Sequence, residues 1–245
     1  MGSPVPCSTI AATLRPPDGT VKYRVPGSAL EFPHPRLAPA MPAAPSIAPP
    51  SAPAPALSDH HLRLMNALAD ALGERVYADV TIADIVARAR VSKRTFYECF
   101  ESKQACFLAL CRYVSDSLMA LIRSCARPGR AWAEVVGDVT RTYLNTIHAR
   151  PALMRALYTE IYAAGQPGRA VRRDIGLRFA DFLRAQVDEA RKTQAGLKPL
   201  SAPLATAVVA GVNEMILELL EEERAEALPS LAAPAQELVL ALTRA

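Results

Sequence analysis

Apolar residues recur at steps of three and four along the chain from Ser58 onward. The first such segment places Leu64 or Met65, Leu68, Leu72 and Val76 on one side, and Ser58 or Asp59 stands where it can cap the start. This spacing is typical of an amphipathic helix whose apolar stripe faces a core. No segment alternates with period two for long enough to indicate a strand. The sequence therefore predicts an all-α fold.

Further helix starts follow hydroxyl residues. Thr81 precedes the short segment IADIVARA, Ser92 precedes KRTFYECF, and Ser102 precedes a longer apolar segment that ends before Pro128 and Gly129. A hydroxyl at such a position accepts a hydrogen bond from a backbone N–H of the first helical turn. Proline or glycine then separates five more segments that we expect to be helical, over residues 131–149, 152–164, 169–193, 202–223 and 231–243.

The N-terminal part of the chain has a different composition. Fourteen of the 21 prolines lie before residue 58, and residues 38–56 contain little besides alanine and proline. Proline lacks a backbone donor and alanine offers little area to bury, so we expect residues 1–57 to form a disordered arm. The arm is slightly basic, which is compatible either with a simple tether or with contact to a polyanion.

Positive charge is concentrated locally. The net charge of +4 permits an anionic partner without requiring one. From 85 to 97, however, the chain carries Arg88, Arg90, Lys93 and Arg94 and no acidic residue. A basic helix is most often simply solvated. Here the acid-free window coincides with a tight turn between two short helices, which favours a specific role.

Two short helices joined by a tight turn match the helix-turn-helix, whose second helix enters the DNA major groove. Phe96 and Phe100 can bury one face of the second helix, which leaves its basic face for DNA. Side chains of this kind contact base edges or phosphates, and helix N-termini favour anions. The residues expected to contact DNA are Thr81, Arg90, Ser92, Lys93, Arg94, Thr95, Tyr97 and Lys103.

The stretch TIADIVARARVSKRTFYECFESKQA resembles the DNA-binding signature of the TetR/AcrR family of bacterial transcriptional regulators, over about residues 60–110. Two positions depart from the usual pattern, because Val76 and Arg90 stand where the family commonly has glycine. A left-handed backbone at Arg90 would cost about 1 kcal/mol more than at glycine, and a slightly altered turn is the alternative. The residues in register are Val91, Ser92, Thr95, Phe96, Tyr97, Phe100, Ser102 and Lys103.

The resemblance implies a dimer with an N-terminal helix-turn-helix and a divergent helical domain that binds an inducer. We therefore expect a DNA-binding domain over residues 58–104 and a larger ligand-binding and dimerisation domain over 105–245. Wide apolar faces near the C-terminus indicate a four-helix interface between two copies, with intramolecular core as the alternative.

Aromatic residues at helical spacing beyond residue 120 indicate either core or the wall of an apolar cavity. Asn145, His148 or Asn213 would add a polar group to such a wall. The candidate ligand-binding residues are Trp132, Tyr143, Met154, Tyr158, Tyr162, Phe179, Phe182 and Asn213.

The sequence lacks the signatures of catalysis. The four histidines are scattered, and no metal-ligand cluster, phosphate-binding glycine loop or nucleophile motif is present, so we expect neither an enzyme nor a bound metal or cofactor. The five cysteines are odd in number and lack a CxxC pair, which indicates reduced thiols and a cytoplasmic protein. Oxidant sensing at Cys99 or Cys106 is the alternative. No secretion signal or uninterrupted membrane segment is evident.

These observations favour a transcriptional repressor that binds a palindromic operator as a homodimer and is released by a small apolar or amphipathic ligand. The alternative is a helical protein-interaction module without a ligand response. Double-stranded DNA, a second copy of the chain and an unknown inducer are the expected partners.

Overall fold

The structure is a computed structural model that describes residues 57–126 and 129–244. The expected N-terminal arm, residues 1–57, lies outside this range except for its last residue. Within the described residues the secondary structure is helical, and the only β-type pairing is an isolated bridge between Leu197 and Arg244. The predicted all-α fold is confirmed.

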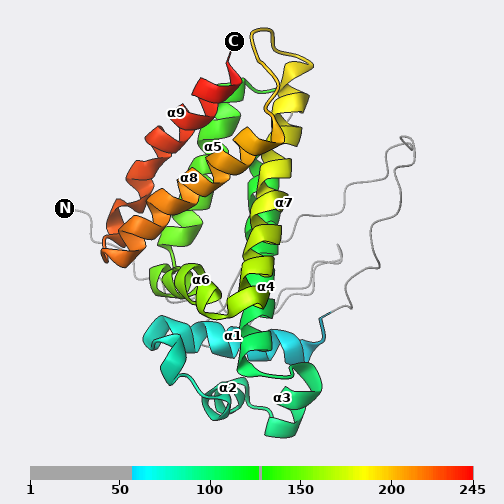
Figure 1. The fold of residues 1–245 in the computed structure, drawn as a ribbon, viewed down its shortest axis with the longest axis vertical. Helices are drawn as coiled ribbons and strands as arrows, with labels where there is room; N and C mark the ends of the chain where they lie inside the picture. The colour runs from blue at the N-terminus through cyan, green and yellow to red at the C-terminus, as the bar shows by residue number, and fades with distance from the viewer. Residues whose placement is uncertain (1–56, 127–128, 245) are drawn as a thin grey trace, which may run out of the picture.

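Three helices and a 3₁₀ turn form one end of the molecule (Figure 1). A long helix, α4, runs from this end into the larger part, and α6 lies across the junction beside α1. The elements of the small end are α1 (Asp59–Glu74), η1 (Tyr77–Asp79), α2 (Ile82–Ala89) and α3 (Lys93–Cys99). The remaining elements are α4 (Lys103–Cys125), α5 (Trp132–His148), α6 (Pro151–Ala163), α7 (Gly165–Arg191), α8 (Ala202–Glu221), η2 (Ala225–Leu231) and α9 (Ala232–Thr243).

The hydroxyl residues cap the helices as predicted. Ser58, Thr81, Ser92 and Ser102 each accept a hydrogen bond from the backbone N–H three residues further on. A cap of this kind stabilises a helix by about 1 kcal/mol. One expectation for the first helix is wrong: Val76 does not continue its buried face. The backbone at Val76 is extended beyond the end of α1, and its side chain is 58% exposed.

A single hydrophobic cluster joins the small end to the larger part. Leu68 of α1, Phe96 of α3, Phe107 of α4 and Leu153 of α6 are all fully buried in it. A second cluster, around Val187, packs the far ends of α5, α7, α8 and α9 together. The helix-turn-helix therefore rests on α4 and α6 through close-packed side chains, which transmit displacement because interiors of this density are stiff.

Two described helices, α4 and α8, are long and apolar enough to cross a membrane by length and composition alone. The most apolar window of α4 is 61% buried inside the structure, as expected for a core helix. The corresponding window of α8 is only 28% buried. The apolar surface of α8 thus exceeds what the described chain covers.

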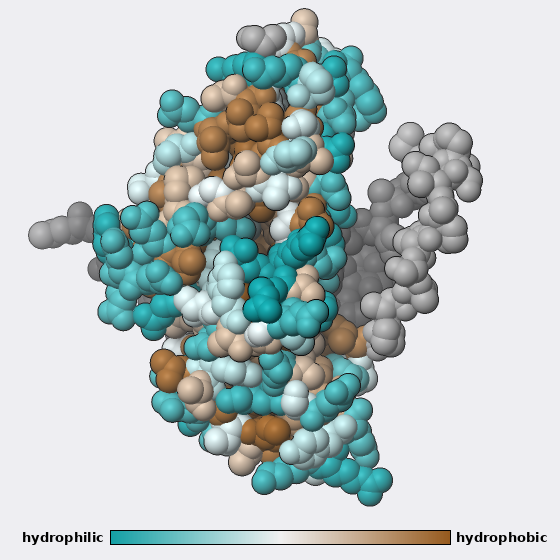
Figure 2. All heavy atoms as spheres, viewed as in Figure 1, coloured by the Kyte–Doolittle hydropathy of each residue, from teal (hydrophilic) through white to brown (hydrophobic). Residues whose placement is uncertain are grey.

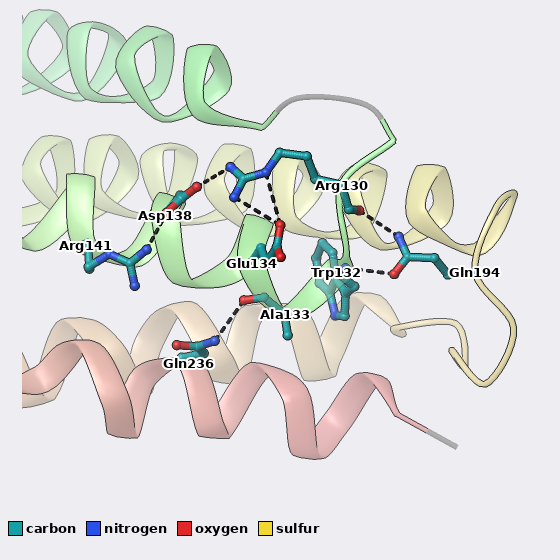
Figure 3. Close-up of polar contacts among 8 residues, drawn as sticks. All are labelled: Arg130, Trp132, Ala133, Glu134, Asp138, Arg141, Gln194 and Gln236. Atoms are coloured by element: carbon teal, nitrogen blue, oxygen red, sulfur yellow. Dashed lines mark hydrogen bonds and ion pairs between the residues drawn. The ribbon is translucent and has the colours of Figure 1, made fainter.

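A polar cluster fixes the start of α5 (Figure 3). No side chain on Ala131 caps this helix; instead Gln194, beyond α7, accepts the Trp132 backbone N–H at 2.7 Å and donates to the Arg130 carbonyl at 3.0 Å. The Arg130 guanidinium pairs with Glu134 and Asp138 of α5. In addition, Gln236 of α9 donates to the Ala133 carbonyl at 2.8 Å. The Gln194 side chain, from the segment after α7, thus replaces the missing cap, and Gln236 adds a contact from α9.

Gly168 allows α7 to pass close to the end of α6. A Cβ added at this position would lie 1.9 Å from the Ile161 carbonyl oxygen. We expect Gly168→Ala to lower the free energy of unfolding by about 1–3 kcal/mol, because the backbones must separate. Gly176→Ala, in the same helix with no atom within 4 Å of the added Cβ, is the control and gains up to about 1 kcal/mol from helix propensity. Urea unfolding at fixed protein concentration measures both, and equal effects at the two sites would contradict the close approach.

Candidate DNA-binding surface and ligand cavity

Helix α3 is anchored from behind by two aromatic rings. Phe96 is fully buried and Phe100 is 7% exposed, with ring centroids 6.0 Å apart. They belong to the same apolar cluster as Ile85 and Val86 of α2. Because this face is fixed, the opposite face of α3 points to solvent at the end of the molecule farthest from α9 (Figure 1).

The basic face of α3 is accessible. Lys93, Arg94 and Tyr97 are exposed, and Lys93 forms no ion pair with any described residue. Arg94 pairs with Glu98 at 2.9 Å, but both side chains are well exposed, and such surface pairs are weak enough to exchange for a phosphate. Tyr97 is 58% exposed, which is unusual for a large ring and leaves its hydroxyl free to meet a partner.

The hydroxyl residues of the expected surface serve partly as caps. Ser92 accepts the Thr95 N–H at 3.0 Å, and the two hydroxyl oxygens lie 2.9 Å apart. Ser92 is exposed and Thr95 half-buried, so both lie at the solvent side of the α3 N-terminus. Thr81 is exposed at the start of α2. These three side chains therefore combine a structural hydrogen bond with a position that a DNA backbone can reach.

The turn between α2 and α3 has the left-handed backbone that glycine would favour. Arg90 adopts φ 53° and ψ 47°, and the Val91 N–H donates to the Val86 carbonyl at 3.1 Å, as in a Schellman ending. The side chain of Arg63 in α1 donates to the carbonyls of Ala89 and Arg90, at 2.5 and 3.1 Å. These bonds offset the cost of placing a side chain at this backbone angle. The alternative of an altered turn is not what the structure shows.

Sequence reasoning missed Arg63, because a residue 26 positions before its acceptor carries no local signal. It also missed the intramolecular contacts of Lys103, which was expected to contact phosphate. The Lys103 ammonium donates to the carbonyls of Tyr77 and Val80, at 2.8 and 2.7 Å, and lies 4.2 Å from the Tyr77 ring centroid. Burial lowers the pKa of this lysine. Lys103 thus ties η1 to α4 through two backbone carbonyls.

An ionic capping box starts α2. Asp84 accepts hydrogen bonds from the Thr81 hydroxyl and backbone N–H, at 2.7 and 2.8 Å, and Arg75 lies 3.4 Å from its other oxygen. The hydrogen bonds from Thr81 are the main reason that the pKa of Asp84 falls from 3.8 to about 2. The carboxylate is therefore the form that holds this corner of the helix-turn-helix.

The larger part of the molecule contains a cavity of about 540 Å³ among α4, α5, α6, α7 and α8. This volume is in the range of small-molecule sites. The structure brings six of the eight expected ligand residues to its wall, namely Tyr143, Met154, Tyr158, Tyr162, Phe179 and Asn213.

The expectation is wrong for the other two residues. Trp132 is buried in the second hydrophobic cluster, and its indole N–H donates to the Thr243 hydroxyl at 2.8 Å. Phe182 lies next to the guanidinium of Arg123, with 5.8 Å between the guanidinium carbon and the ring centroid. Helical spacing identifies aromatic residues that face inward, but it does not tell which of two cores they enter.

Three side chains form a polar centre in the cavity wall. The hydroxyls of Tyr143 and Tyr158 lie 2.9 Å apart, and each is 3.1 Å from Oδ1 of Asn213. The three residues come from α5, α6 and α8. Burial raises the pKa of Tyr143 and raises that of Tyr158 well above its ordinary value, so both phenols stay neutral. These three side chains can donate and accept hydrogen bonds without carrying charge.

The cavity wall also contains polar residues that sequence reasoning missed. Arg169, Arg172 and Arg173 of α7 line it, and Arg172 stacks 4.7 Å from the Tyr162 ring centroid. Ser115 of α4 is 6% exposed, and its hydroxyl has no hydrogen-bond partner in the described structure. The arginines do follow helical spacing in the sequence, but only the folded structure shows that this side of α7 faces a cavity.

Cys99 of α3 and Cys106 and Cys111 of α4 offer no reactive thiolate. Burial raises the pKa of Cys106 and of Cys111 to about 12, and it also raises that of Cys99. Because the thiolate is the reactive form, these residues behave as small apolar groups at neutral pH. The alternative of oxidant sensing at Cys99 or Cys106 therefore gains no support from the structure.

Comparison with known proteins agrees with this geometry. Residues 64–110 match the family described as bacterial regulatory proteins, tetR family. No curated protein matches the chain. The matched segment spans α2, α3 and most of α1, and the resemblance to TetR-family transcriptional regulators is confirmed. Regulators of this family are DNA-binding proteins rather than enzymes, in agreement with the expected class.

Solved structures share the fold over most of their length. The fatty acid degradation regulator FadR from Bacillus halodurans is 15% identical with a TM-score of 0.66, covering 75% of this chain and 96% of that one. FadR from Bacillus subtilis, solved in complex with stearoyl-CoA, is 16% identical with a TM-score of 0.64, covering 73% and 97%. The regulatory protein TetR from Rhodobacter sphaeroides is 23% identical with a TM-score of 0.59, covering 74% and 99%. At these identities the likeness establishes the fold.

The capping box gives α2 a pH dependence with a defined sign. Because folding lowers the pKa of Asp84, its contribution is complete above pH 3.8 and is lost as the pH falls towards about 2. We expect Asp84→Asn to weaken the pH dependence of stability between these values, as measured by urea unfolding across an acid pH series. Asp79→Asn, which removes an exposed acid outside the box, is the control. An unchanged acid profile for Asp84→Asn would argue against the box.

Proposed function

We propose that this protein is a cytoplasmic transcriptional repressor that binds a palindromic operator as a homodimer and releases it when a ligand fills the cavity. The observation that carries the proposal is the geometry of α3. Phe96 holds the helix from behind, while Lys93, Arg94 and Tyr97 project from the free end of a TetR-type domain. A rigid helix with basic and hydroxyl side chains on its open face fits a DNA major groove.

The DNA-binding domain in this proposal comprises residues 58–104, and residues 105–245 form the ligand-binding and dimerisation domain. Lys93 and Arg94 read base edges or phosphates from the N-terminal turn of α3, and Tyr97 donates its hydroxyl to a phosphate. Arg90 adds a cation at the turn. Binding then weakens steeply with salt, because each phosphate contact releases a counterion. The proposed contact residues are Thr81, Arg90, Ser92, Lys93, Arg94, Thr95 and Tyr97.

The dimer is supported by apolar surface on the C-terminal helices. The most apolar window of α8 is only 28% buried, and Leu204 is 44% exposed. In Figure 2, the largest brown area of the visible face lies towards the end of the molecule formed by the C-terminal helices. A second copy packed through α8 and α9 would cover this surface and pair two α3 helices, which must lie about 34 Å apart, or a multiple of this, to read a palindromic operator.

Helix α6 links the cavity to the DNA-binding domain. Met154 and Tyr158 line the cavity, whereas Arg150 at the start of α6 pairs with Asp70 of α1 at 3.1 Å. Gln104, near the start of α4, donates to the Ala164 carbonyl at the other end of α6 with a distance of 2.8 Å. A ligand that binds one position of α6 more tightly therefore shifts the position of α1 and the spacing of the two α3 helices. An amphipathic ligand is supported by the likeness to Bacillus subtilis FadR, which was solved in complex with stearoyl-CoA.

Charge reversal on α3 tests DNA binding. We expect Lys93→Glu with Arg94→Glu to weaken binding at least about 100-fold to a DNA site selected from a random pool, because two phosphate or base contacts become repulsive. Gel shift measures binding, and light scattering confirms the dimer. Arg191→Glu with Lys192→Glu, which reverses the same charge at the far end of α7, is the control. Unchanged DNA binding by the α3 variant would sink the proposal and favour the protein-interaction module.

A charge on the free face of α8 tests dimerisation. Ala207 is exposed in the single chain, and we expect Ala207→Glu to give a monomer because the pair of copies would bury two unpaired carboxylates. Ala185→Glu, at an exposed position of α7, should leave the dimer intact. Light scattering gives the mass and circular dichroism confirms that both variants are folded. A dimeric Ala207→Glu variant would place the interface elsewhere.

A further inference from the structure

The charge pairing of α7 changes along its length. Arg178, Arg184 and Arg191 each pair with a nearby aspartate. The arginines at 169, 172 and 173, in the first turns of the helix, form no ion pair with any described carboxylate. These three are also the ones that line the cavity. Positive charge is thus left unneutralised only where α7 borders this space.

The rest of the cavity wall contains no negative charge. No aspartate or glutamate lines it, and burial raises the pKa of Tyr143 and Tyr158, two of its three tyrosines, so these two phenols stay neutral. A cationic ligand would meet three guanidinium groups without a counter-ion, whereas an anion would be attracted to them and can accept their hydrogen bonds. The positive charge of the cavity wall therefore favours an anionic ligand.

Ser115 provides a second and independent sign of a ligand. It is 6% exposed, lines the cavity, and its hydroxyl has no partner in the described structure. The neighbouring Ser117 follows the usual pattern, donating to the Tyr113 carbonyl one turn earlier at 2.9 Å. Leaving a buried hydroxyl unpaired is unfavourable, so the lone partnerless group at the cavity wall is a natural contact for a polar atom of the ligand.

Ser115 and the three arginines lie at different heights along the cavity. Helices α4 and α7 run side by side in the same direction, because Gln104 bonds to Ala164 and Asp116 pairs with Arg178. Ser115 is therefore level with about residue 177, four to eight residues beyond the three arginines. At 1.5 Å per residue this separation is roughly 6–12 Å along the helix. Apart from the polar centre of Tyr143, Tyr158 and Asn213, the wall is largely apolar, with Val114, Leu157, Ile161 and Ile175.

We propose that the cavity binds an organic anion with an extended apolar body. The headgroup lies at Arg169, Arg172 and Arg173, and one uncharged oxygen or nitrogen within the body meets Ser115. This inference rests on the proposed ligand response and specifies its chemistry. A carboxylate and a phosphate share the required charge and acceptor geometry, so the experiment distinguishes them.

The charge of the headgroup is tested by calorimetric titration of the full chain with four probes of equal chain length. We expect dodecanoate or dodecyl phosphate to bind at least about tenfold more tightly than dodecanol, and dodecyltrimethylammonium to bind most weakly. The stronger of the two anions identifies the headgroup. Equal binding of the anions and the cation would overturn the inference.

Two variants distinguish the effect of the cavity arginines from the effect of the protein's net charge. Changing Arg169, Arg172 and Arg173 to glutamine should weaken binding of the preferred anion about tenfold or more and leave dodecanol unchanged. The control changes Arg141, Arg191 and Lys192, which are exposed outside the cavity, and removes the same charge. Equal loss in both variants would mean non-specific attraction and would overturn the assignment of these arginines.

The role of Ser115 is tested with 7-hydroxydodecanoate, whose mid-chain hydroxyl can reach that depth. The unaltered protein should prefer it to dodecanoate about fivefold, and Ser115→Ala should abolish the preference while binding dodecanoate as before. Ser117→Ala, which removes a hydroxyl already bonded to its own helix, should retain the preference. Absence of any preference for 7-hydroxydodecanoate, or a preference that survives Ser115→Ala, would overturn the assignment of Ser115 as a ligand contact.

These titrations contain no DNA, so they are independent of operator binding. If the protein binds DNA as a dimer but no anionic probe, the inference fails and the DNA-binding regulator stands. If the anion binds through the three arginines but the protein binds no DNA, the ligand site stands and the proposed function fails.

Discussion

The burial of Phe96 is the constraint on which the rest of the molecule's arrangement depends. A helix of seven residues is too short to be stable alone, so packing must hold it. Phe96 supplies that packing, and it also decides which side chains of α3 face solvent. With the ring inside, Lys93, Arg94 and Tyr97 can only point outwards. The same contact therefore stabilises the helix and defines its exposed face.

The second constraint is that this anchored helix shares its core with the helices that surround the cavity. Phe107 of α4 and Leu153 of α6 belong to the cluster that contains Phe96, and the same two helices also contribute Ser115 and Met154 to the cavity wall. In the proposed function, a ligand and a DNA site thus contact different parts of one close-packed body. Polar links such as the pair between Arg150 and Asp70 add direction to this coupling, because they join α6 to α1 at a defined point.

The fold and the recognition helix could be predicted from local sequence, since caps, helical periodicity and the acid-free window all act over a few residues. Ser92, Phe96 and Lys93 carry these signals directly. Long-range contacts could not be predicted in this way. Trp132 and Phe182 have the spacing of cavity residues but enter other packing sites, and Lys103 has the position of a phosphate clamp but bonds to carbonyls of Tyr77 and Val80. Ser115 gives no sequence signal at all, because only the fold leaves its hydroxyl without a partner.

The left-handed turn at Arg90 has a consequence for how such domains can vary. Glycine is favoured at this backbone angle because it has no side chain. A glycine there, however, has no functional group that could contact a partner. Here the guanidinium of Arg63 binds the two carbonyls at the turn, so the conformation no longer depends on glycine. The position is thereby released to carry a cation of its own beside the recognition helix. The hydrogen bonds from Arg63 to the turn thus allow residues other than glycine at position 90.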